Sequence, residues 1–156
     1  MNAQGPWKTS TGSNLLIRAA FSFDWITKSF FEYDKGELAG LSEDIRGLRV
    51  YTVRSLPLGK KSKSGFHKIR SDMAIGIEGK VELECEDLFG NSKKFIITPE
   101  NGIWMPPYIL QTHQALEDNS GLLLIANTLF VAENKDTHDT FSVEEFKGLQ
   151  SKIKSI

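Results

Sequence analysis

Hydrophobic and polar residues alternate most regularly over residues 80–86. Val81, Leu83 and Cys85 fall on one face of an extended chain, and glutamates fall on the other. This period of two predicts a half-buried strand of an antiparallel sheet. Residues 88–92 have the composition of a hairpin turn, so a paired strand is expected to follow them.

Other short strands are predicted on both sides of this hairpin. Residues 49–53 are rich in β-branched and aromatic side chains, and the odd-numbered residues of 73–77 are apolar and predicted to line a barrel. Residues 102–105 form a strand that a double proline ends, and the apolar run at 122–125 fits a buried central strand. Many short strands separated by turn residues predict a β-sandwich or a β-barrel.

The hydrophobic period changes near the C-terminus. Ser142 and Glu145 have the spacing of a capping box, and apolar residues then recur at helical spacing as far as Ile153. We therefore predict a helix over about residues 142–154. Residues 136–139, which include a histidine, are typical of a solvated turn before it.

Composition narrows the class of protein. The 156 residues suffice for one domain with a sizeable core, and we predict a flexible arm at 1–13 and a single domain at 14–156. The 19 basic and 20 acidic side chains give a net charge of −1, which argues against nucleic-acid binding. No apolar stretch is long enough to cross a membrane, no signal peptide is evident and Cys85 is a single cysteine, so a cytoplasmic location is expected.

Residues 99–107, Pro-Glu-Asn-Gly-Ile-Trp-Met-Pro-Pro, resemble the double-proline segment of the sugar-nucleotide 3,4-ketoisomerases, which are WxcM-like cupins. Residues 34–38 are similar to an early turn of that family, residues 65–67 to its histidine motif, and residues 141–146 to its closing helix. The resemblance implies an all-β cupin jelly-roll barrel with a short C-terminal helix. It also implies a homodimer that binds a dTDP-sugar.

The histidine motif departs from the family pattern. The family has two histidines, two residues apart, and this chain has only His67 there. Either His67 is the first and Ile69 replaces the second, or His67 is the second and Gly65 replaces the first. We favour the second register because it needs no gap, and a one-residue slip would turn every side chain of a flanking strand to the other face. The family's arginine falls on Lys63 or Ser64.

The family's reaction, implied here by the resemblance, moves a ketone from C4 to C3 of the sugar. A base must remove a proton from C3 and return one at C4, and histidine suits this task near neutral pH. A donor is also needed near the developing oxyanion. We predict His67 as the base. Tyr108, His113 and Tyr51 are candidates for the second group, of which Tyr108 and His113 are predicted as catalytic.

Five residues are predicted to bind substrate. Arg49, Arg70 and Lys63 are candidates for phosphate contacts. The ring of Trp104, like that of Tyr108, is a candidate for stacking on a base or a sugar, and Tyr51 is the fifth residue. The basic loop around Lys63 fits a solvated turn better than a phosphate site, and Trp104 fits a core position equally well.

No metal and no other cofactor are expected. His67 and His113 offer two ligands, and a dedicated metal site needs more. The leading hypothesis is a 3,4-ketoisomerase of deoxysugar biosynthesis acting on a dTDP-4-keto-6-deoxyhexose. The alternative is a non-catalytic cupin that binds a nucleotide sugar or a partner enzyme, since one motif histidine is missing. A third is a 3,5-epimerase, whose histidine, aspartate and tyrosine we do not find in order.

Overall fold

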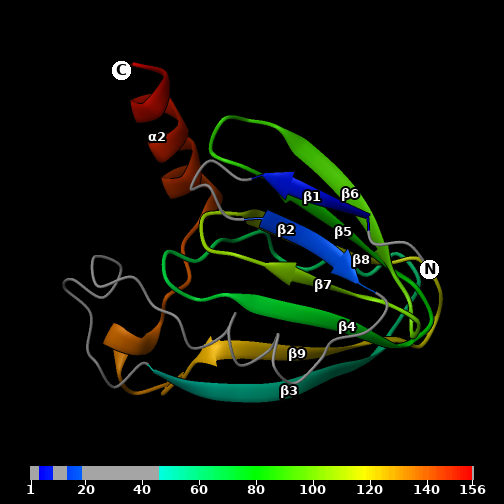
Figure 1. The fold of residues 1–156 in the computed structure, drawn as a ribbon. Helices are drawn as coiled ribbons and strands as arrows, with labels where there is room; N and C mark the ends of the chain where they lie inside the picture. Colours follow the sequence, from blue (N-terminus) through cyan, green and yellow to red (C-terminus); the bar gives the residue numbers. More distant parts are fainter. Residues whose placement is uncertain (1–3, 9–13, 19–45, 156) are drawn as a thin grey trace.

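The structure, a computed structural model, describes residues 4–8, 14–18 and 46–155 as an antiparallel β-structure with a helix at one end (Figure 1). A six-stranded sheet has the order β1-β2-β7-β4-β9-β3, and a three-stranded sheet has the order β6-β5-β8. The strands of the larger sheet are β1 (Gln4–Lys8), β2 (Asn14–Arg18), β3 (Arg46–Leu56), β4 (Asp72–Glu78), β7 (Gly102–Met105) and β9 (Ser120–Thr128). Those of the smaller sheet are β5 (Val81–Glu86), β6 (Ser92–Ile97) and β8 (Leu110–Ala115).

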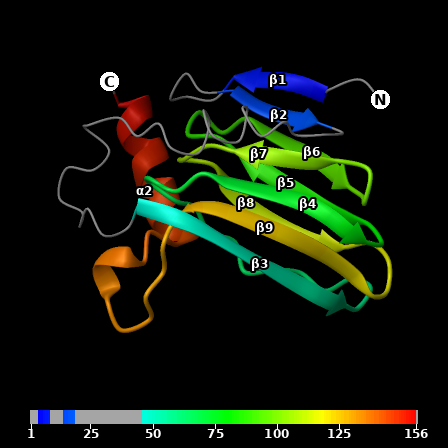
Figure 2. The same ribbon diagram turned by 60° about the horizontal axis from the view of Figure 1, so that its bottom comes forward.

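The two sheets lie face to face, and the larger one is in front in Figure 2. Their facing sides meet in one apolar core. Ala74 and Leu124 of the larger sheet pack there with Leu83, Cys85 and Phe95 of the smaller one. Burial of this apolar surface is the main force that holds the sheets together.

The predicted hairpin and C-terminal helix are confirmed. β5 alternates between buried and half-buried residues over its whole length and pairs with β6. Helix α2 (Val143–Lys154) has the predicted capping box, in which the Ser142 side chain and the Glu145 backbone are paired. A one-turn 3-10 helix, η2 (Lys135–Thr137), precedes it.

The predicted orientation of β4 is wrong for Met73 and Ile75. Ala74 faces the core between the sheets, whereas Met73 and Ile75 pack with Trp104 and Ile125 on the opposite face. Apolar residues occupy both faces here, and alternation alone cannot say which face of such a strand is the inner one. The inner face therefore carries residues 72, 74 and 76, and the first of these proves important for the site.

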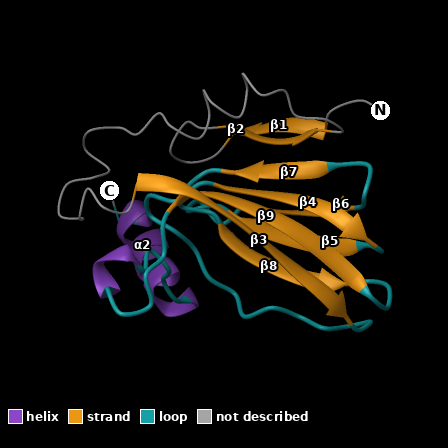
Figure 3. Ribbon diagram, turned by 90° about the horizontal axis from the view of Figure 1, so that it is seen from below, coloured by secondary structure: helices purple, strands orange, loops and turns teal. Residues whose placement is uncertain are grey.

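Helix α2 lies at one end of the strands (Figure 3). Phe146 of the helix meets the ring of Phe66 edge to face, with 5.1 Å between the ring centroids. The backbones of Phe66 and Phe141 also exchange two hydrogen bonds. These contacts bring the segment before α2 against residues 66–70, although about seventy positions separate them in the sequence.

Two sequence predictions concern the first forty residues. Residues 4–8, within the segment predicted as a flexible arm, form β1 paired with β2. Much of that segment, and the turn-like residues 34–38, lie outside the described residues. Among the described residues, none of the helices is long and apolar enough to cross a membrane.

Candidate active site

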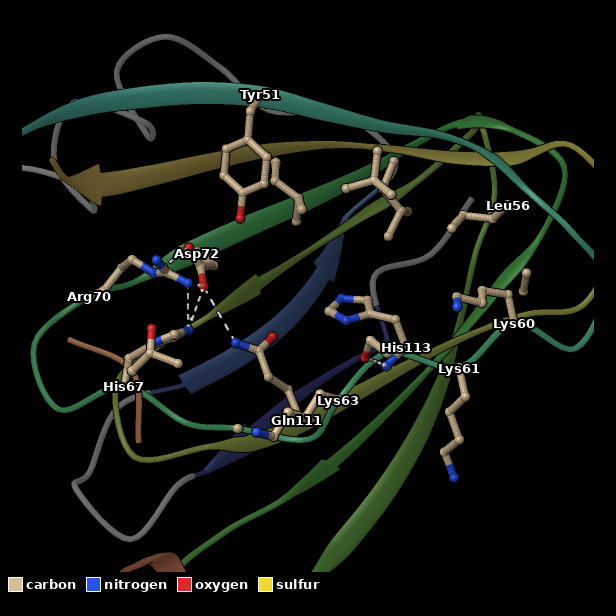
Figure 4. A pocket seen from close by; sticks show the side chains of 17 residues that line it. Tyr51, Leu56, Lys60, Lys61, Lys63, His67, Arg70, Asp72, Gln111 and His113 are labelled. Carbon is tan, nitrogen blue, oxygen red and sulfur yellow. Dashed lines mark hydrogen bonds and ion pairs between the residues drawn. The ribbon is translucent and has the colours of Figure 1, made fainter. Parts of the chain in front are cut away.

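A cavity of about 430 Å³ opens between the two sheets (Figure 4). One part of its wall is apolar and comes from β3, the end of β8 and β9. The other part gathers polar side chains from the loop before β4, from β4 itself and from β8. The polar group is His67, Arg70, Asp72, Gln111 and His113.

His67 lies buried at the polar part of the cavity and has three polar neighbours. Its Nε2 atom is 2.7 Å from Nη2 of Arg70 and 3.2 Å from Oδ2 of Asp72. Its Nδ1 atom is hydrogen-bonded to the backbone carbonyl of Asp139. Because a carbonyl oxygen can only accept, Nδ1 carries the hydrogen, and any proton exchanged by the ring is exchanged at Nε2.

The two neighbours of Nε2 suit the two protonation states of the ring. In the neutral ring, Nε2 has a lone pair that accepts a hydrogen bond from Arg70. In the imidazolium, Nε2–H donates to the carboxylate of Asp72. The site therefore offers a partner to His67 both before and after it takes a proton.

Asp72 is the acidic member of this cluster. Burial alone would raise its pKa, but the hydrogen bond that protonated Nε2 of His67 donates, the charge of Arg70 and the hydrogen bond from Gln111 lower the pKa to about 2. Arg70 Nε lies 3.1 Å from Oδ1 of Asp72, and Gln111 Nε2 lies 3.4 Å from its Oδ2. Asp72 is thus a carboxylate at neutral pH.

Asp139 fixes the loop that carries His67. Its carboxylate accepts hydrogen bonds from three consecutive backbone N–H groups, those of Lys68 (2.9 Å), Ile69 (2.8 Å) and Arg70 (2.6 Å). Since the Asp139 carbonyl also accepts from His67, this single residue sets both the course of the loop and the tautomer of the ring. The prediction of a solvated turn at 136–139 is wrong at Asp139, which is buried by these contacts.

His113 lines the cavity from the smaller sheet, on the same face of β8 as Gln111 and Ala115. The residue is only partly buried, but its Nε2 atom is buried and has no hydrogen-bond partner among the described residues. Burial lowers the pKa of His113 to about 4, against a smaller opposing effect of the Asp72 charge. The ring is therefore neutral at neutral pH.

Four of the other predicted residues lie around the cavity. Tyr51, Lys63 and Arg70 line it, and Arg49 lines an adjoining hollow of about 270 Å³ that Tyr51 and Arg70 share. The guanidinium of Arg49 lies 5.1 Å from the centre of the Tyr51 ring. Burial, followed by the charge of Arg70, lowers the pKa of Arg49.

Besides Arg49, two predicted residues are not among those that line the cavity. Trp104 packs against Met73 on the other face of the larger sheet. The ring of Tyr108 lies 6.3 Å from that of Phe66, in the cluster beside α2. Tyr108 reaches the site through its backbone, because its N–H donates to the carbonyl of His67 at 2.8 Å.

Sequence reasoning missed Asp72, Gln111 and Asp139. Asp72 and Gln111 are polar residues on the inner faces of strands. A correct prediction of which face of β4 is the inner one would therefore have indicated Asp72. Asp139 had no such signal, because its contacts are with a segment far away in the chain. Within the described part of the chain, no group of three or more His, Cys, Asp or Glu side chains could hold a metal ion.

Comparisons with known proteins agree with this architecture. Solved structures of similar fold include the TDP-quinovose 3,4-ketoisomerase WlaRB of Campylobacter jejuni, at 18% identity and a TM-score of 0.55, over 63% of this chain and 72% of that one. The sugar 3,4-ketoisomerase QdtA of Thermoanaerobacterium thermosaccharolyticum, solved with TDP, has 16% identity and a TM-score of 0.58, over 67% of this chain and 73% of that one. A variant of the B. subtilis cupin oxalate decarboxylase has 23% identity and a TM-score of 0.53, over 63% of this chain and 24% of that one. The predicted fold, an all-β cupin jelly roll with a short C-terminal helix, is confirmed.

A search among curated proteins finds no match to this chain. The family model described as "FdtA: WxcM-like, C-terminal" matches residues 40–145, which include every described residue of the cavity wall. The chain belongs to this WxcM-like family.

Proposed function

We propose that the protein is a 3,4-ketoisomerase that acts on a dTDP-4-keto-6-deoxyhexose. The observation that carries this proposal is His67, which lines a cavity with Nε2 between a donor, Arg70, and a carboxylate, Asp72. These two partners suit a base before and after it takes a proton. The family and the ketoisomerase structures of similar fold support the same reaction.

The reaction begins with His67 as a neutral base. Its Nε2 lone pair takes the proton from C3 of the sugar, and the C3–H electron pair forms a C3–C4 double bond. The electrons of the C4 carbonyl move onto its oxygen, which gives an enediolate. His67 is then an imidazolium, which the carboxylate of Asp72 stabilises at 3.2 Å.

The second half of the reaction returns the proton. The imidazolium protonates C4 from Nε2, and the proton of the C3 hydroxyl passes to the oxygen on C4, so that C3 becomes the new ketone. The oxygen on C4 gains one hydrogen and becomes a hydroxyl. The sugar therefore keeps its formula, and His67 ends neutral, with Arg70 again donating to its lone pair.

The mouth of the cavity suits an anionic group. Lys60, Lys61 and Lys63 line it on a loop that is held to β8, where Ser62 N–H donates to the His113 carbonyl at 2.8 Å. We infer that these lysines and Arg49 attract the diphosphate of the nucleotide, while the sugar enters the cavity. The homodimer and the cytoplasmic location remain predictions.

Nuclear magnetic resonance tests this function directly. Purified protein is mixed with dTDP-4-keto-6-deoxyglucose in deuterated buffer, with His67→Gln as the inactive control. We expect a 3-keto product and loss of the C3 proton signal with wild-type protein only. If the wild type binds the sugar nucleotide but forms no 3-keto product and leaves the C3 proton signal unchanged, the ketoisomerase function is wrong.

One observation favours a second candidate, a nucleotide-sugar binding protein without activity. In the favoured register Gly65 occupies the position of the first motif histidine, and it lines the cavity without a side chain. A binding protein would be stabilised against heat by dTDP and would leave the C3 proton in place.

A further inference from the structure

His113 has a buried polar atom for which the folded chain supplies no partner. Its Nε2 is buried, faces the cavity side of β8 and makes no hydrogen bond to any described residue. A buried polar atom left unpaired costs about 1–3 kcal/mol, so such atoms in native proteins call for an explanation. A ligand in the cavity would complete this hydrogen bond.

The position of His113 fits the reacting sugar. Gln111 reaches Oδ2 of Asp72 at 3.4 Å, and that oxygen is the one next to His67. His113 follows two residues later on the same face of β8, about 7 Å further along the cavity. This offset is about the width of one sugar ring, and Figure 4 shows the ring of His113 beyond Gln111, toward the lysine loop.

His67 and His113 also approach the cavity from different sides. His67 belongs to the loop before β4 of the larger sheet, and His113 belongs to β8 of the smaller sheet. A sugar held between them meets His67 on one side and His113 on another. His67 can therefore act on a carbon while His113 contacts an oxygen.

We propose that Nε2–H of His113 donates a hydrogen bond to the sugar oxygen that carries the negative charge in the enediolate. This inference rests on the proposed ketoisomerase function. It supplies the second polar group of the site from β8, in place of the missing motif histidine. No bond to His113 forms or breaks, and its proton stays on the ring.

The neutral state of the ring supports this role. Burial lowers the pKa of His113 to about 4, so at neutral pH the ring donates a hydrogen bond without being a cation. A fixed neutral donor strengthens its bond as charge develops on the oxygen, which is how an oxyanion site accelerates a reaction. The nearby oxygen atoms of Asp72 and of Gln111 (Oε1) are acceptors, so they cannot donate a hydrogen bond to an oxyanion.

Two substitutions test the role of His113. His113→Leu removes the donor and keeps an apolar side chain, so we expect the protein to fold and kcat to fall by about 10²- to 10³-fold. His113→Gln keeps an N–H donor and should recover part of the loss. Gln114→Leu, a neighbour on β8 that does not line the cavity, is the matched control and should keep wild-type kcat. Wild-type-like thermal unfolding of each variant is required for the comparison.

The results separate this inference from the proposed function. If the wild type isomerises the sugar and His113→Leu stays within about threefold in kcat, the inference is overturned and the function stands. The inference is also overturned if both His113 variants lose kcat equally and the ring ¹⁵N resonances of wild-type His113 do not move when the sugar nucleotide binds. If the wild type is inactive, binding can still show whether His113 contacts the sugar. The ratio of the Kd for dTDP to the Kd for dTDP-4-keto-6-deoxyglucose is measured in the wild type and in His113→Leu, and a contact with the sugar should make the two ratios differ. A ratio unchanged in His113→Leu would contradict that contact.

Discussion

At the residue scale, the imidazole of His67 has partners suited to both of its protonation states. Arg70 donates to the neutral ring, and Asp72 accepts from the protonated one. The Asp139 carbonyl keeps the other nitrogen protonated throughout. This arrangement explains how one histidine can both take and return a proton, which the sequence alone could not show.

Asp72→Asn tests the acceptor in this pair. The amide keeps the size of the side chain but loses the negative charge, so the imidazolium loses its stabilisation. We expect kcat for the loss of the C3 proton to fall by about 10²-fold or more. Binding of dTDP should stay near wild type, because the proposed diphosphate contacts are at the lysine loop and do not include Asp72. A kcat within threefold of wild type would show that His67 does not depend on this carboxylate.

His113 makes the stability of the protein depend on pH between about 6.5 and 4. Its folded-state pKa of about 4 lies below the ordinary value of 6.5, so the unfolded chain takes up a proton first as the pH falls. Between pH 7 and pH 4.5 the wild type should therefore lose about 2 kcal/mol of unfolding free energy, relative to His113→Leu. Urea unfolding of both proteins at pH 7 and pH 4.5 measures the difference. Parallel losses in the two proteins would show that His113 does not titrate in this way.

At the element scale, the loop 66–70 and the segment before α2 form one unit. Asp139 accepts three backbone hydrogen bonds from the loop, and Phe66 and Phe141 are paired by two more. The sequence predicted α2 from its capping box and β5 from its alternation, because both signals are local. It could not predict the contact of Asp139 with the loop, because that pairing depends on where the chain returns.

Asp139→Asn should loosen this unit. In the wild type both carboxylate oxygens accept from backbone N–H groups. Asparagine replaces one oxygen by an NH₂ group, which cannot accept, so at least one of the three hydrogen bonds is lost. We expect a loss of about 2–3 kcal/mol in unfolding free energy, and faster amide exchange at residues 68–70. Asp118→Asn is the matched control, since Asp118 is exposed and accepts one backbone hydrogen bond, from Leu58 at 2.8 Å. Equal losses in the two variants would contradict a special role for Asp139.

At the scale of the whole molecule, charge is nearly balanced but unevenly placed. The net charge is −1, yet Lys60, Lys61 and Lys63 all line one cavity. The sequence predicted the basic loop but left its role open between a solvated turn and a phosphate contact. The fold brings the loop beside β8, which no local pattern could indicate.

Replacing Lys60, Lys61 and Lys63 together by glutamine should weaken dTDP binding about 10- to 30-fold. Each exposed lysine contributes up to about 1 kcal/mol to attraction of the diphosphate, and the contributions are reduced by salt. The matched control replaces Lys93, Lys152 and Lys154, which do not line the cavity, and it changes the net charge by the same amount. Titration calorimetry with dTDP and with thymidine, at low and high salt, measures the effect. The cavity variant alone should lose affinity for dTDP and most of its salt dependence, and thymidine binding should not change. If both triple variants weaken dTDP binding equally, overall charge attracts the ligand and the lysine loop does not contact the diphosphate.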